Sequence, residues 1–167
     1  MSEDTSSLAS LRIPDLIALS AAIASSDMPL SVFQAIERIA MARMRVSIFS
    51  ASTCFPDTLE LERIYSSRPD AYPVGARKSK RQTNWAQYVL RDRRVFVGEG
   101  PLEMAAAFDD QERMASLGIR SIINVPVVAR DEILGVLAFA RSETRVSAED
   151  LADARLLGIA ATVAFLA

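Results

Sequence analysis

Residues 118–139 read GIRSIINVPVVARDEILGVLAF, and both halves of this stretch have the composition of β-strands. They are rich in isoleucine and valine, whose β-branched side chains favour extended backbone. The four residues between them, ARDE at 129–132, are polar and form a connection short enough for a tight turn. The stretch therefore predicts one long antiparallel hairpin.

Helices are predicted on both sides of this hairpin. A first helix places Leu16, Leu19 and Ile23 on one narrow apolar face, and a second helix carries a wider apolar stripe over residues 32–40. After the hairpin, the sequence SAED at 147–150 has the spacing of a helix cap and predicts a final helix with one apolar face.

The region between these helices and the hairpin alternates short elements with irregular segments. Alternating apolar residues predict a strand pair over residues 45–51 and 59–65, joined by residues 53–57. Prolines and a glycine then predict an irregular segment over residues 66–84. The remaining expected elements are a helix over 85–90, a strand over 94–97, and short helices over 101–108 and 109–117, the last with Asp109 as its N-cap.

The order of these elements resembles the GAF domain family. The resemblance is carried by a helix ending near Gly118, a strand with NVPV at 124–127, a charged turn, and a strand with LGVL at 134–137. It implies an α+β fold: an antiparallel β-sheet of five or six strands with the terminal helices on one face and an irregular ligand-facing segment on the other. We expect a polar N-terminal leader over residues 1–12 and a single GAF-like domain over residues 13–167.

Signatures of several GAF subfamilies are missing from the sequence. Asn124 is followed by Val125, which departs from the Asn-Lys pattern of cyclic-nucleotide-binding GAF domains. The chain has no histidine to stand beside a bilin, and it has one cysteine where the methionine-sulfoxide reductases of this fold use several. The resemblance therefore points to a sensor and leaves its small molecule unidentified, and no cofactor is expected.

Composition excludes several other classes of function. The net charge of −2 and a pI near 5.3 argue against nucleic-acid binding, which needs clustered cations to displace counterions from phosphates. The lack of histidine removes the commonest general base and the usual ligands of zinc and haem, and the single Cys54 cannot form an intrachain disulfide. We expect no catalytic residues and no metal site, and we interpret Cys54 as an inert thiol.

No membrane or secretory segment is expected. Residues 1–7, MSEDTSS, lack the basic and apolar regions of a secretory signal. The longest apolar run, over residues 156–167, contains Thr162 and is shorter than the roughly 20 residues that cross a bilayer. The sequence therefore predicts a cytoplasmic protein.

The candidate binding site combines cations with aromatic side chains. Seven of the nineteen basic residues fall between positions 77 and 94, and the only tryptophan and all three tyrosines lie between positions 65 and 88. Arginine can bind carboxylate or phosphate groups, and polar-tipped aromatics suit a small-molecule pocket. The basic run also fits a solvated loop. The candidate ligand-binding residues are Tyr72, Arg77, Arg81, Trp85, Tyr88, Phe96 and Asn124.

Asn124 stands out because it lies in an apolar strand, where an unpaired amide would cost about 1–3 kcal/mol if buried. A ligand, a neighbouring backbone group or an exposed edge would each satisfy it.

The predicted function is a stand-alone sensor that binds an anionic small molecule and signals through a dimer or a partner protein. A homodimer is expected through the terminal helices, because their apolar faces, including Leu156, Val163 and Phe165, exceed what one sheet face covers. The alternatives are a small enzyme on a GAF scaffold that acts on an anionic metabolite, and a ligand-free dimerisation module.

Overall fold

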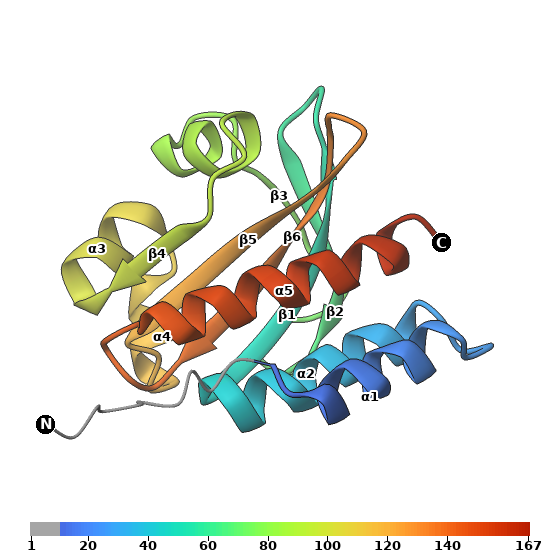
Figure 1. Cartoon of the computed structure of the whole chain (residues 1–167). Coiled ribbons are helices and arrows are strands. Elements are labelled where there is room, and N and C mark those ends of the chain that lie inside the picture. Colours follow the sequence, from blue (N-terminus) through green and yellow to red (C-terminus); the bar gives the residue numbers. More distant parts are fainter. Residues whose placement is uncertain (1–10) are drawn as a thin grey trace, which may run out of the picture.

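The computed structural model describes residues 11–167 and contains one six-stranded antiparallel sheet with helices on both faces (Figure 1). The strand order is β3-β2-β1-β6-β5-β4, so β1 and β6 lie in the middle of the sheet and β3 and β4 at its edges. The strands are β1 (Val46–Phe55), β2 (Glu60–Ser66), β3 (Arg77–Ser79), β4 (Phe96–Glu99), β5 (Ser121–Ala129) and β6 (Glu132–Arg141).

The long hairpin predicted from residues 118–139 is confirmed as β5 and β6. Its turn residues Arg130 and Asp131 have φ angles of 52° and 60°, as a two-residue turn with both central residues left-handed requires. The two strands pair from Ser121 opposite Arg141 to Ala129 opposite Glu132.

Three helices cover one face of the sheet: α1 (Ile13–Ile23), α2 (Leu30–Met44) and α5 (Ala148–Phe165), which lie together at the front in Figure 1. Ile123 and Leu137 of the central strands point into the core that these helices close. The terminal helices thus occupy one face, as the resemblance implies. No helix in residues 11–167 is both long and apolar enough to cross a bilayer.

The opposite face is covered by the middle of the chain. A short π-helix, η1 (Ala86–Arg91), packs on this face together with α3 (Gly100–Ala107) and α4 (Gln111–Ser116). Since successive residues of a strand point to opposite faces, Ile122 and Val136 lie on this side while their neighbours face the terminal helices. Both faces of the central strands are therefore buried.

The structure corrects three local predictions. Strand β1 continues to Phe55, so residues 53–55 extend the strand instead of joining the pair. Residues 77–79, expected to be irregular, form the edge strand β3 because they pair with β2 from Glu60 opposite Ser79. Helix α4 has Asp110, not Asp109, at its N-cap position, without a side-chain cap. Residues 1–10 of the expected leader lie outside the described residues.

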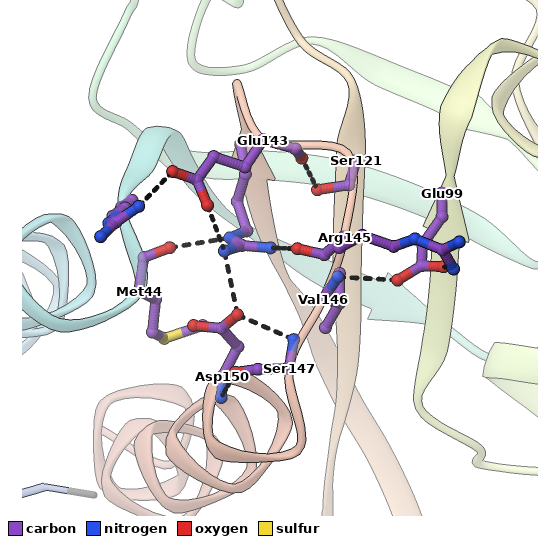
Figure 2. A network of polar contacts seen from close by, with 10 residues as sticks. Met44, Glu99, Ser121, Glu143, Arg145, Val146, Ser147 and Asp150 are labelled. Carbon is purple, nitrogen blue, oxygen red and sulfur yellow. Dashed lines mark hydrogen bonds and ion pairs between the residues drawn. The ribbon is translucent and has the colours of Figure 1, made fainter. Parts of the chain in front are cut away.

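Arg141, at the end of β6, is 2% exposed, and its partners Met44, Arg145 and Asp150 are labelled in Figure 2. Its Nε donates to the carbonyl oxygen of Met44 at the end of α2 (2.7 Å), and its Nη1 donates to the carbonyl oxygen of Arg145 (2.8 Å). Its Nη2 lies 2.9 Å from Oδ2 of Asp150, which also completes the predicted cap of α5 with Ser147. A buried cation thus fixes α2 and α5 to the sheet.

Candidate ligand-binding site

A cavity of about 130 Å³ lies between the sheet and the middle of the chain. Its floor comes from β1, β2, β5 and β6, which contribute small and apolar side chains together with the Ser50 and Ser52 hydroxyl groups. We call the opposite side the cover, which consists of residues 72–85 before η1 and residues 108–114 after it. Its lining residues in the cover are Tyr72, Ala76, Lys78, Lys80, Trp85, Phe108, Asp110 and Met114.

Trp85 and Asn124 connect the cover to the floor. The indole Nε1 of Trp85 donates a hydrogen bond to Oδ1 of Asn124 at 3.0 Å, and the two residues are 6% and 2% exposed. This bond satisfies the amide oxygen of Asn124, for which the sequence alone left the partner open. Tyr72, Trp85 and Asn124 are the three sequence-predicted site residues that line the cavity.

Arg63 is a partly buried cation of the cavity. Its Nε is buried and has no hydrogen-bond partner among residues 11–167, while its Nη1 donates to the carbonyl oxygen of Pro73 at 3.3 Å. The guanidinium carbon lies 5.1 Å from the centre of the Tyr72 ring. Burial lowers the pKa of Arg63 below its usual value, because desolvation disfavours the charged form.

Two lysines add positive charge at the same cavity. The Nζ of Lys80 lies 5.7 Å from the centre of the Trp85 ring, and burial, followed by the charge of Lys78, lowers the pKa of Lys80. Lys78 lies 4.0 Å from the exposed Asp109. Among the lining residues, Asp110 alone carries a carboxylate, so the lining holds three cations against one anion.

The predicted residues Arg77 and Arg81 lie outside the cavity lining. Arg77 neighbours Lys78 in β3 and therefore points to the other side, where it pairs with Glu60 at 2.7 Å and lies 3.9 Å above the Phe55 ring. Arg81 is exposed, and its Nη2 lies 3.5 Å from the carbonyl oxygen of Asp57. These two cations belong to the outer surface of the sheet edge.

Tyr88 and Phe96 are also absent from the lining. Tyr88 is 39% exposed and lies beneath the guanidinium group of Arg94, 5.7 Å from its carbon. Phe96 packs edge-on against Phe108 with 5.9 Å between ring centres, so it supports a ring that lines the cavity.

Sequence reasoning missed Arg63, and it placed Lys78 and Lys80 in the basic run without selecting them as site residues. The signal for Arg63 was available, because the alternation that places Leu61 inward continues to residue 63. The signal for the lysines was hidden, since the edge strand β3 that orients them forms only by pairing with β2.

Other chemistry is not evident in the described part of the chain. Residues 11–167 contain no group of three or more His, Cys, Asp or Glu side chains that could hold a metal ion. Cys54 is buried, and desolvation raises the pKa of its thiol to about 11, so the thiol is protonated at neutral pH.

Residues 30–165 match the family model described as GAF domain. This chain belongs to the GAF domain family. GAF domains are sensory, ligand-binding modules of signalling proteins, and the fold is generally regulatory. The resemblance to this family, first seen in residues 118–139, is therefore confirmed over most of the chain. No curated protein sequence is significantly similar to it.

Solved GAF structures share the architecture of this GAF domain at low sequence identity. The GAF domain of a Coxiella burnetii phosphoenolpyruvate-protein phosphotransferase is 14% identical with a TM-score of 0.71, covering 92% of this chain and 91% of that chain. A Bacillus halodurans sensor histidine kinase GAF domain is 16% identical with a TM-score of 0.68, covering 83% and 93%. A phycocyanobilin-bound GAF domain from a cyanobacterial phytochrome is 17% identical with a TM-score of 0.66, covering 92% and 94%. These likenesses concern the fold.

Proposed function

We propose that this GAF domain is a small-molecule sensor, not an enzyme, and that it binds an anionic ligand in the cavity between the sheet and the middle segment. Tyr72, Trp85 and Asn124 remain ligand contacts in this proposal. Arg63 and Lys80 take the anion-binding role first expected of Arg77 and Arg81. The cytoplasmic location expected from the sequence stays a prediction.

The excess of positive charge around the cavity is the observation that carries the proposal. Neither Arg63 nor Lys80 forms an ion pair within residues 11–167, although both are partly buried. An unpaired cation held away from water is unfavourable, and a bound anion would relieve that cost. The same charges would repel a cationic ligand.

A thermal-shift screen of anionic, neutral and cationic metabolites tests the proposal. We expect stabilisation by anions, and we expect Lys80→Ala to weaken that stabilisation while Arg77→Ala and Arg81→Ala leave it unchanged. The two arginines are matched controls because they carry the same charge on neighbouring residues outside the cavity. Stabilisation only by neutral or cationic compounds would contradict the proposal, and turnover of a stabilising anion would favour the enzyme.

We also propose that the signal leaves through a homodimer of the terminal helices. The exposed apolar residues of α1 are Ile13, Leu16 and Ile17, and those of α5 are Leu156, Ile159 and Val163. Each set follows a helical spacing and forms one stripe, whereas Leu19, first expected at the interface, is buried in the core. Helix α1 begins beside α5, where the Leu11 amide donates to Asp153 at 2.8 Å.

A second copy of the chain is the occupant proposed for this surface, because a twofold axis lets an apolar patch pack against itself. Light scattering at micromolar concentration should give twice the chain mass for the native protein and the chain mass for Ile159→Arg. Leu102→Arg is the control, since Leu102 is 86% exposed on α3, away from the terminal helices. A monomeric native protein would contradict the dimer and would favour a separate partner protein.

A further inference from the structure

The volume of the cavity is small. Pockets for drug-sized molecules enclose about 300–1,000 Å³, and an apolar protein cavity of about 150 Å³ holds a single benzene molecule. At about 130 Å³, the cavity of this chain matches one six-membered ring. Because the cavity is partly open, a larger ligand would extend out of it.

The walls favour a flat and mostly apolar occupant. Ile48, Ile122 and Val136 of the floor face the aromatic rings of Trp85 and Phe108 in the cover. The two rings are tilted by 56° with 6.4 Å between their centres, an arrangement that offers both a face and an edge to a third ring. Inorganic phosphate alone would leave these apolar walls without contacts.

Arg63 supplies positive charge to the lining of the cavity. Its Nε is buried and has no acceptor among residues 11–167, and its guanidinium group takes part in none of the ion pairs among these residues. The planar edge of a guanidinium group matches the two oxygens of a carboxylate. Asp110 acts on Arg63 only through its longer-range charge.

We infer that the ligand is a single-ring aromatic monocarboxylate whose carboxylate accepts hydrogen bonds from Arg63 while its ring lies between the sheet and the pair Trp85 and Phe108. This inference rests on the proposed function, since it specifies the anion that the same cavity binds. Arg63 then determines specificity, and Lys80 adds positive charge to the same cavity.

Binding of benzoate provides the test, with the fluorescence of Trp85 as the readout. Trp85 is the only tryptophan of the chain and lines the cavity, so its emission reports occupancy directly. We expect saturable binding of benzoate and at least about tenfold weaker binding of benzamide, its neutral analogue of similar shape, because a charge-assisted pair with Arg63 is lost. Cyclohexanecarboxylate, which keeps the charge but is not flat, should also bind more weakly than benzoate.

A second experiment measures benzoate binding by the variants Arg63→Met and Arg63→Lys. Both should weaken benzoate binding by roughly tenfold or more, because neither side chain offers the planar fork of arginine. Arg77→Met is the matched control, and its benzoate affinity should equal that of the native protein. If Arg63→Met fails to fold, Arg63→Lys and the comparison of benzoate with benzamide in the native protein still decide the question.

The outcomes separate the inference from the proposed function. Equal binding of benzoate and benzamide, or equal losses in the Arg63 and Arg77 variants, would overturn the inference. Binding of succinate or phosphate that depends on Lys80, without binding of benzoate, would overturn the inference and leave the anion-sensing proposal standing. Absence of binding by every anion tested would overturn both.

Discussion

The indole nitrogen of Trp85 donates a 3.0 Å hydrogen bond to the side-chain oxygen of Asn124, although 39 residues separate them in the chain. Trp85 immediately precedes the π-helix η1, and Asn124 lies in strand β5. This buried bond fixes the cover on the sheet and closes one side of the cavity. The geometry of the binding site therefore depends on it.

We expect Trp85→Phe to lower the free energy of unfolding by about 1–3 kcal/mol, because it leaves the buried amide oxygen of Asn124 without a donor. Urea denaturation followed by far-ultraviolet circular dichroism measures this change without relying on the tryptophan. Tyr88→Phe, which removes a hydroxyl group from the exposed side of the same π-helix, should change stability by less than about 0.5 kcal/mol. Equal effects of the two substitutions would contradict a structural role for the bond.

We expect Arg141→Met to destabilise the protein by about 3–5 kcal/mol, since it leaves the partly buried Asp150 without its cation and two carbonyl oxygens without donors. Thermal and urea unfolding check the size of the loss. Arg145→Ala is the control because its side chain is 91% exposed and its backbone oxygen still accepts from Arg141. A stability of Arg141→Met within 1 kcal/mol of the native value would show that the network in Figure 2 contributes little.

We expect the stability of the native protein to fall as the pH rises from about 9 to about 11. Burial raises the pKa of the Cys54 thiol to about 11, so over this window the unfolded chain releases the thiol proton while the folded chain keeps it. Urea unfolding across this range should give a steeper loss for the native protein than for Cys54→Ala. Parallel pH profiles of the two proteins would contradict the assignment.

The same burial predicts that Cys54 does not act as a redox sensor. A thiol-specific disulfide reagent at pH 8 should react with Cys54 only after denaturant is added, because reaction requires an accessible thiolate. Rapid reaction of the folded protein would instead support a sensing role for this thiol.

We expect Gly158→Ala to destabilise the protein, although alanine favours a helix by about 1 kcal/mol over glycine. A β-carbon at position 158 would lie 2.8 Å from Cγ1 of Val125, because α5 packs closely on β5 there. Overpacking of this kind costs about 1–3 kcal/mol. Adding Val125→Ala should relieve the clash, so we expect the double variant to lose less stability than the sum of the losses in the two single variants. A loss equal to that sum would show that the close contact is not the cause.

The sequence by itself determined the elements whose signals are local. The β-branched halves of residues 118–139 and their polar turn predict the hairpin β5–β6, and the spacing of Ser147 and Asp150 predicts the start of α5. These patterns work because strand alternation, helix periodicity and capping each depend on residues only a few positions apart. The clustering of aromatic residues between positions 65 and 88 also predicted that Tyr72 and Trp85 line the cavity.

Tertiary structure decided which cations of that segment face the cavity. Lys78 and Arg77 are neighbours with the same charge, and only the pairing of β3 with β2 turns Lys78 inward and Arg77 toward Glu60. Arg63 becomes partly buried because the cover folds over β2 from a segment nine or more residues further along the chain. Composition shows how much charge a segment carries, whereas the direction of each charge depends on pairing between strands that the local sequence does not encode.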